Sequence, residues 1–213
     1  MIDLHTHTIL SDGELLPTEL VRRAAVHGYT AIGITDHVDF SNLEFVLGSL
    51  KRVKDAGKEW DIDVLIGVEL THIPPVKIEK IVAQARQLDA ELIIMHGETL
   101  VEPVAPGTNA VATHLGDIDI IAHPGLITIE DAEAARDNDI CLEITSRKGH
   151  CLTNGHVARI ATEVGATLVV NTDAHSPADL ISEQRALEIA RGAGLSEKEA
   201  VRVVSINPKK FLK

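Results

Sequence analysis

Two histidines near the amino terminus have the spacing to grip one metal ion. His5 and His7 lie two residues apart in an extended, alternating stretch, which puts both imidazoles on one strand face and Ile2 and Leu4 on the other. Asp12, in the loop that follows, adds a carboxylate that can reach the same place. Taken alone, the pattern also fits a strand end that happens to carry two histidines, so the rest of the chain has to decide.

Residue types that bind metals also follow five later apolar stretches. Short apolar runs bounded by turn residues predict buried strands. Most of the later histidines and acids come at, or just after, the carboxyl ends of these runs. They stand in the motifs T-D-H at 35–37, G-V-E at 67–69, H-G at 96–97, A-H-P-G at 122–125 and T-D-A-H at 172–175.

Seven strand and helix units alternate along the chain with short connections, which predicts an α/β protein with a parallel sheet. No internal repeat or linker interrupts the alternation, so we expect a single domain over residues 1–213. Polar pairs three residues apart predict three capped helices, at Ser41 with Glu44, Thr128 with Asp131, and Ser196 with Glu199. The strands after the amino-terminal one are expected at Thr30–Thr35, Asp63–Leu70, Glu91–Met95, Ile118–Ala122, Ile140–Thr145 and Thr167–Thr172.

The distribution of the polar residues distinguishes a closed barrel from an open sheet. In a closed parallel barrel the carboxyl ends of all strands meet at one mouth, where active sites lie. In an open sheet of seven strands, the outer strand ends would be more than about 20 Å apart. The candidate residues come from six of the seven units. A barrel gathers them and an open sheet scatters them, so we predict a (β/α)7 barrel.

These motifs, together with the H-T-H at residues 5–7, resemble the polymerase and histidinol phosphatase (PHP) family. The resemblance covers essentially the whole chain, and all six motifs occur in the family's order. It implies a distorted TIM-like barrel that holds two or three divalent ions of zinc, manganese or iron. Carried over position by position, the metal ligands would be His5, His7, Asp12, His37, Glu69, His96, His123, Asp173 and His175.

The chemistry of these side chains agrees with that implication. Mixed imidazole and carboxylate sites suit zinc, manganese or iron, and the absence of cysteine from the set argues against a structural zinc. Nine ligands exceed the need of one ion, and Glu69 is the carboxylate expected to bridge two. Paired ions activate water as a bound hydroxide for attack at phosphorus. Asp36 is either a further ligand or a group that orients one. The residues expected to act in catalysis are His5, His7, Asp12, Asp36 and His37.

One basic pair accompanies the ligands after the sixth strand. Arg147 and Lys148 are predicted to bind the phosphate of a substrate, because arginine grips phosphate with two parallel hydrogen bonds. Glu143, on that strand, is expected to face inward as either a buried hydrogen-bonded carboxylate or a substrate contact. His72 is a weaker candidate for the mouth, and His150 and His156, which flank the loop after the sixth strand, are weaker candidates for a functional role.

Composition narrows the class of partner. The net charge of −12 repels nucleic-acid backbones and anionic membranes, so we expect neither as a partner. No apolar run approaches the roughly 20 residues of a membrane span, and no basic and apolar leader precedes Asp3. We therefore expect a cytoplasmic protein that acts on a small phosphorylated substrate. The oligomeric state is left open.

Three functions compete at this stage. The favoured one is hydrolysis of a small phosphomonoester, either similar to histidinol phosphate or derived from a nucleotide. The second is an amidohydrolase-type enzyme that cleaves C–N or C–O bonds; such enzymes also open with H-x-H but usually include a metal-bridging lysine, and none is assigned here. The third is a non-catalytic barrel similar to an archaeal ribonuclease P subunit, which the full ligand set and the acidic charge argue against.

Overall fold

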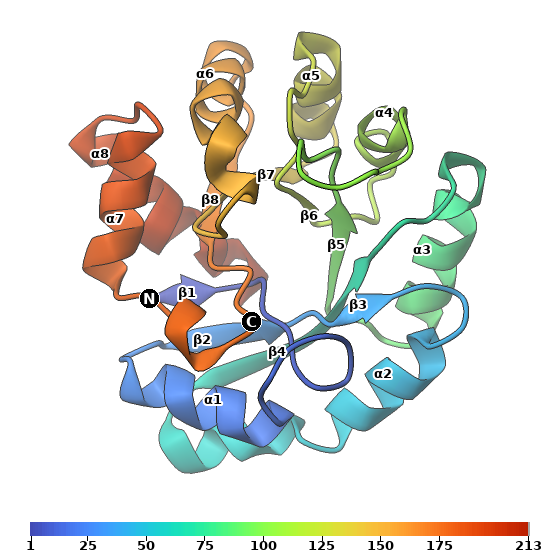
Figure 1. The fold of residues 1–213 in the computed structure, drawn as a ribbon, viewed down its shortest axis with the longest axis vertical. Helices are drawn as coiled ribbons and strands as arrows, with labels where there is room; N and C mark the ends of the chain where they lie inside the picture. Colours follow the sequence, from blue (N-terminus) through green and yellow to red (C-terminus); the bar gives the residue numbers. More distant parts are fainter. Residues whose placement is uncertain (213) are drawn as a thin grey trace.

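The computed structural model describes residues 1–212 and shows a nearly closed barrel of parallel strands surrounded by helices (Figure 1). Neighbouring strands pair in the order β1-β2-β4-β5-β6-β7-β8, and a short β3 pairs beside β4. The predicted barrel is confirmed. The strands are β1 Ile2–Asp3, β2 Ala31–Ile34, β3 His37–Val38, β4 Asp63–Leu70, β5 Leu92–His96, β6 Ile120–Ala122, β7 Cys141–Thr145 and β8 Leu168–Asn171.

Strands β2 and β3 together make one interrupted strand of the barrel, so the predicted number of seven holds. Both pair in parallel with β4, β2 along residues 63–66 and β3 along residues 69–70. Between them the backbone turns aside at Thr35, whose N–H donates to the carbonyl of Thr6 on the amino-terminal segment. The interruption brings the residues after β2 against those after β1.

The barrel closes between β1 and β8 without a regular ladder. Past the two strand ends, the N–H of His7 donates to the carbonyl of Ala174 at 2.8 Å, and the N–H of Asp173 donates to the carbonyl of His5 at 2.9 Å. Lower down, the buried carboxylate of Asp3 accepts from both the N–H and the hydroxyl of Thr172. Two backbone hydrogen bonds and the side chain of Asp3 therefore close the seam in place of a regular ladder, next to the histidines of interest.

The barrel interior is divided into an apolar floor and a polar mouth. Every second residue of a strand faces the interior, and such residues, among them Leu65, Leu92 and Ile94, pack in one cluster. Phe211 and Leu212 pack against this cluster at the amino-terminal end of the barrel. A larger cluster fills the space between the strands and the helices. The inward-facing residues nearest the carboxyl ends of the strands are polar, so the candidate site lies above the apolar cluster.

The predicted alternation along the first strand is wrong beyond Asp3. Ile2 and Leu4 belong to the interior cluster, yet His5 also points inward, with Nδ1 2.8 Å from Oε2 of Glu143. Regular strand geometry ends at Asp3, so the two-residue repeat no longer decides which way the side chains of residues 4–7 point.

Helices cover the outside of the barrel (Figure 1). Two of the three predicted caps are confirmed, since the hydroxyls of Thr128 and Ser196 accept from the N–H groups of Asp131 and Glu199. The helices are α1 Pro17–Val26, α2 Leu43–Lys51, α3 Ile78–Gln87, α4 Thr108–Ala112, α5 Ile129–Asp137, α6 Asn154–Val164, α7 Glu183–Gly192 and α8 Glu197–Val201, with 3₁₀ turns at Lys54–Trp60, Pro75–Lys77, His150–Thr153, Pro177–Asp179 and Asn207–Phe211 and a π turn at Arg202–Ile206.

The cap expected at Ser41 is wrong. Helix α2 begins at Leu43 without a side-chain cap, and the hydroxyl of Ser41 donates instead to Asp39 at 2.6 Å. The Ser41 hydroxyl was expected to accept a hydrogen bond from the helix backbone. The nearby carboxylate of Asp39, which the pattern did not take into account, accepts a hydrogen bond from it instead. Within residues 1–212, no helix combines the length and the apolar character needed to cross a bilayer.

Candidate metal centre

All nine predicted ligands converge at the carboxyl ends of the strands. Their ligand atoms form four groups, and within each group all atoms lie within 4.8 Å of one another. Glu69, His5, His7 and His123 each take part in two groups, so the four groups share residues and form one centre. The four groups are His7, Asp12, His37 and His175; His5, His123 and Asp173; His5, His7 and Glu69; and Glu69, His96 and His123.

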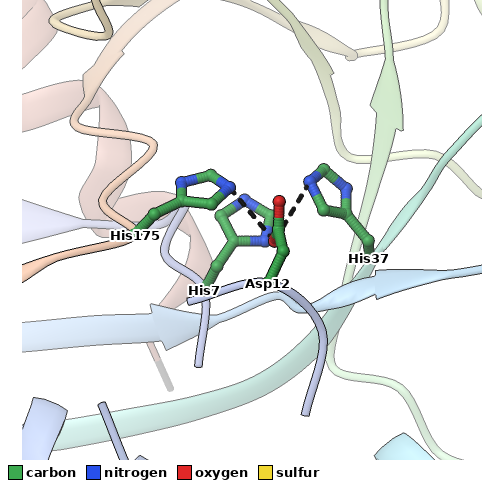
Figure 2. A group of neighbouring side chains, drawn as sticks. All are labelled: His7, Asp12, His37 and His175. Atoms are coloured by element: carbon green, nitrogen blue, oxygen red, sulfur yellow. Dashed lines mark ion pairs between the residues drawn. The ribbon is translucent and has the colours of Figure 1, made fainter. Parts of the chain in front are cut away.

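The group at the rim joins three segments that are far apart in the sequence, namely residues 7–12, His37 and His175 (Figure 2). Oδ1 of Asp12 lies 3.2 Å from Nε2 of His175 and 3.6 Å from Nε2 of His37. The ring of His7 stacks on the ring of His175, with 4.1 Å between centroids. The side chain of Asp12 is 58% exposed, whereas His7 is fully buried. This is therefore the side of the centre that meets solvent.

Glu69 lies at the middle of the centre. Its carboxylate is fully buried and lies 2.8 Å from Nδ1 of His37, 3.3 Å from Nε2 of His5 and 3.6 Å from Nε2 of His123. Burial acts to raise the pKa of Glu69, but the charges of His5 and His37 outweigh it and hold that pKa well below its usual value. An ionised carboxylate among imidazoles on several sides is suited to bridging cations.

Two of the candidate ligands adopt strained backbone conformations. His123 has φ of 29° and Asp173 has φ of 54°, the left-handed region that non-glycine residues seldom occupy. His123 directly follows β6, and Asp173 lies two residues after the end of β8. Both bring side-chain atoms to His5, with 5.8 Å between the His5 and His123 ring centroids and 3.8 Å from Nε2 of His5 to Oδ1 of Asp173. Such strain persists where the surroundings enforce it and is concentrated at functional sites.

The buried groups fit divalent cations. Oε1 of Glu69, and Nδ1 of His7 and of His123, are buried without a hydrogen-bond partner among residues 1–212. Burial and the neighbouring imidazoles lower the pKa of His7 and His123 well below the usual value, so both rings are neutral, the form that binds metals. Nε2 of His7 faces Nε2 of His5 at 3.1 Å. Nitrogen and oxygen ligands without thiolate suit zinc, manganese or iron.

Glu143 holds the ring of His5 from below. Its Oε2 lies 2.8 Å from Nδ1 of His5 and accepts from Nδ2 of Asn171 at 2.9 Å. This contact leaves Nε2 of His5 free to point at Glu69, and carboxylates play this role beside many metal-binding histidines. Of its two predicted roles, the structure shows the buried hydrogen-bonded carboxylate. Glu143 is fully buried, and its contact with a substrate stays a prediction.

Asp36 does not join any of the four groups. Its buried carboxylate accepts from the N–H and the hydroxyl of Thr8 and from the hydroxyl of Ser11, at 2.7–2.8 Å. These three bonds fix the loop that presents Asp12, one residue beyond Ser11. The structure therefore gives Asp36 a positioning role, and a direct part in catalysis stays a prediction.

The predicted basic pair lies beside the centre and not inside it. Nη1 of Arg147 is 3.4 Å from Oδ2 of Asp179, and that same oxygen accepts from the N–H of His175 at 3.1 Å. Lys148 is exposed. Both residues line a cavity between α6 and α7, and their contact with a substrate phosphate stays a prediction.

One acidic residue at the mouth was missed from the sequence. The side chain of Glu102, in the loop after β5, lies 3.0 Å from Nε2 of His96, 3.4 Å from Nε2 of His150 and 3.7 Å from Nε2 of His72. The charge and hydrogen bond of His96 lower the pKa of Glu102 to about 2. His72 and His150, weaker sequence candidates, thus do lie at the mouth. No strand periodicity covers Glu102, so the sequence carried no signal for it.

Tight loop packing holds His96 and His123 in place. A Cβ on Gly97 would lie 2.3 Å from the carbonyl oxygen of Ala122, and one on Gly125 would lie 1.8 Å from that of Glu98. The loops after β5 and β6 therefore touch through backbone. The side chain of Asn109 ties them further, because it accepts from the N–H of Glu98 and donates to the carbonyl of Pro124.

A comparison with protein families shows to which family the chain belongs. The model of the PHP domain matches residues 3–163. The chain belongs to the PHP domain family. This PHP domain is 51% identical over 213 residues to an uncharacterized protein of Methanocaldococcus jannaschii, across 99% of this chain and 98% of the relative. It is 28% identical to a probable phosphatase of a Thermoanaerobacter species, across 100% of this chain and 94% of the relative.

A solved structure shares the fold of this PHP domain. A chain in archaeal ribonuclease P with mature tRNA superposes with a TM-score of 0.73 at 15% identity, covering 98% of this chain and 89% of that one. At this identity the likeness shows the fold alone. The match to the family model confirms the predicted family, and the shared fold confirms the predicted barrel.

Proposed function

We propose that this PHP-domain protein is a metal-dependent phosphoesterase that hydrolyses a small phosphomonoester, similar to histidinol phosphate or derived from a nucleotide. Membership of the family and the relative named as a probable phosphatase support phosphoesterase chemistry. The observation that carries the proposal is the convergence of nine residues with nitrogen and oxygen ligand atoms in four groups, two of which share buried Glu69. That set offers enough ligands for two or three zinc, manganese or iron ions.

The chain's own residues define what such a centre can do. When bound, the ions would supply positive charge for the phosphoryl oxygens and lower the pKa of a coordinated water. Glu69 and Asp173 would hold ions from within the barrel, while Asp12 and His175 would do so from the rim. Glu143 orients His5, and Asp36 orients the loop of Asp12. The apolar floor closes the barrel below, so a substrate must enter from the rim.

The proposal is tested by metal content and activity together. Protein purified without chelator is expected to contain two or three transition-metal ions per chain by elemental analysis. It should hydrolyse p-nitrophenyl phosphate and some members of a panel of phosphorylated metabolites, and lose this activity with a chelator. A metal content near zero after reconstitution with manganese, zinc or iron would refute the assignment of the centre.

The same assay examines the amidohydrolase alternative. None of the strands β1 to β8 contains a lysine, although such enzymes usually have a lysine that bridges two metals. Turnover of amide or lactone substrates without any phosphatase activity would nevertheless favour that class. A purely structural role, as in a ribonuclease P-like barrel, fits poorly with nine converging ligands and a net charge of −12.

Replacing Arg147 with alanine should weaken substrate binding more than catalysis. A phosphate oxygen held by Arg147 is already present in the ground state, so losing the contact should mainly raise KM. A charge-assisted pair contributes roughly 1.5–3 kcal/mol, which corresponds to a rise of about ten- to a hundredfold. Steady-state kinetics with a phosphorylated substrate measures the split, with exposed Arg159 changed to alanine as the control. An unchanged KM would remove Arg147 from the substrate site.

A further inference from the structure

A cavity separate from the metal centre opens between α6 and α7. Its volume is about 530 Å³, and none of the nine candidate ligands lines it. Cavities of roughly 300–1,000 Å³ are the size that binds small molecules. The metal centre does not account for this cavity, so the residues that line the cavity indicate what it could bind.

The charged side chains around the cavity are mostly basic. Arg147, Lys148 and Arg185 line it, against the single acid Asp179. Three cations around one cavity stand out in a chain with a net charge of −12. Arg185 also pairs with exposed Glu188, at 3.0 Å from Nη1 to Oε2. Lys148 is exposed and has no ion-pair partner within residues 1–212, so its charge is available to a ligand.

The acid in the wall is already engaged. Oδ2 of Asp179 accepts from the N–H and the hydroxyl of Ser176, both at 2.8 Å, and from the N–H of His175. These contacts and Arg147 offset its charge, which leaves a positive potential in the cavity. The first residues of α6, Asn154 and Gly155, also line the wall, and the amino-terminal end of a helix favours an anion.

Other parts of the wall are apolar. Leu152 lines the cavity from the 3₁₀ turn before α6. Ile181 lines it from the segment before α7, Ile189 from α7, and Ala193 from the residue after α7. A bare inorganic ion would leave these side chains without a contact. The walls therefore suit a molecule that has both an anionic group and an apolar body.

We propose that the cavity between α6 and α7 is a second binding site, which takes a small organic molecule with a phosphate or similar anionic group. Lys148 and Arg185 hold the anionic group, and Leu152 and Ile189 contact the body of the ligand. The site does not depend on phosphoesterase activity, because no metal ligand belongs to it. It is nevertheless connected to the metal centre, since Arg147 contacts Asp179 and Asp179 accepts from the N–H of His175.

The chain carries its own reporter for this site. Cys151 lines the cavity and is partly exposed, while the other cysteine, Cys141, is fully buried beneath the mouth. Burial raises the pKa of the Cys141 thiol to about 11, so it does not compete for a thiol reagent. The rate at which iodoacetamide alkylates Cys151 therefore reports occupancy of the cavity, independently of turnover.

The test titrates the metal-loaded protein with phenylphosphonate, which has an anionic head and an apolar ring and cannot be hydrolysed as an ester. Saturable slowing of Cys151 alkylation, by about tenfold or more, is expected. In the double variant Lys148→Ala, Arg185→Ala, the half-protecting concentration should rise at least about tenfold, the effect of one lost charge-assisted contact. Benzyl alcohol, which lacks the anionic head, should give no protection, and Lys198→Ala on exposed α8 is the matched control.

Two results would overturn the proposal. One is the absence of saturable protection at tens of millimolar phenylphosphonate. The other is equal protection in the double variant, which retains the metal centre and would then be reporting ligand bound there. Both outcomes are separate from failure of the phosphoesterase proposal, since neither measurement involves hydrolysis.

A kinetic comparison then identifies the source of the anion. If the ligand is an effector, phenylphosphonate should change the rate of p-nitrophenyl phosphate hydrolysis without competing with the substrate. If the cavity holds a remote anionic group of the substrate, Arg185→Ala should raise KM about tenfold for substrates with a second anionic group and leave KM for p-nitrophenyl phosphate unchanged. Either result supports a site in the cavity if the rate change disappears in the double variant, and a rate change that persists there would place the anion elsewhere.

Discussion

Replacing Glu69 with glutamine is expected to remove at least one metal ion per chain and to lower kcat by more than about a thousandfold. Glutamine preserves the volume of the side chain but loses the charge that two of the four ligand groups share. Because mutation of groups that merely orient metal ligands already costs 10- to 100-fold in activity or affinity, loss of a shared carboxylate should cost more. Elemental analysis and initial rates on p-nitrophenyl phosphate measure the two effects on the same preparation.

The control for this change is Glu79→Gln, the same substitution on exposed residues of α3. It should retain full metal content and full activity. If Glu69→Gln also kept both, then Glu69 would not bridge ions and the centre would have to be rebuilt around the rim group of Asp12 and His175. Loss of activity with unchanged metal content would instead point to a role for Glu69 with the substrate.

Much of this site could be predicted because the barrel converts sequence position into spatial position. His96, His123 and Asp173 lie at strand ends, and in a closed parallel barrel every carboxyl end faces the same mouth. The sequence therefore needed only the strands and their order. The gathering of these residues did not require knowing any side-chain conformation.

The contacts that could not be predicted depend on tertiary neighbours or on irregular backbone. Glu143 was expected to face inward, but its partner His5 is 138 residues away in sequence. The inward turn of His5 follows from the end of regular geometry at Asp3, where strand periodicity no longer applies. Glu102 lies in a loop, and no repeat indicates that its side chain reaches His96.

Arg147 shows a different limit. Its place after the sixth predicted strand correctly put Arg147 near the barrel mouth. The sequence did not indicate on which side of the rim it lies. The loop after β8 supplies Asp179, which engages Arg147 next to the cavity between α6 and α7. Residue type and strand order thus predicted the convergence of the nine candidate ligands better than the position of Arg147, because Arg147 lies in a loop and the paths of loops depend on packing.

Removing the metals should lower the thermal stability of the protein by roughly 15–30 °C. The centre buries the carboxylates of Glu69, Glu143 and Asp173 in a space that also holds several imidazoles. Burial raises the pKa of Asp173 to about 7, a sign that its charge is costly without a cation. Each ion present at a thousand times its Kd stabilises the folded state by about 4 kcal/mol. Two ions therefore contribute about 8 kcal/mol, and each kcal/mol shifts Tm by about 2–4 °C at this chain length.

Differential scanning calorimetry of chelated and manganese- or zinc-reconstituted protein measures this shift. The Glu79→Gln control should show the full difference, whereas Glu69→Gln should show about half of it or less, because fewer ions bind. The comparison separates metal binding from catalysis, since no substrate is present. Equal Tm values for the chelated and reconstituted forms would mean that the buried carboxylates are compensated by protonated imidazoles alone. In that case the nine side chains would form a hydrogen-bonded polar core, and the metal centre would be refuted on stability as well as on content.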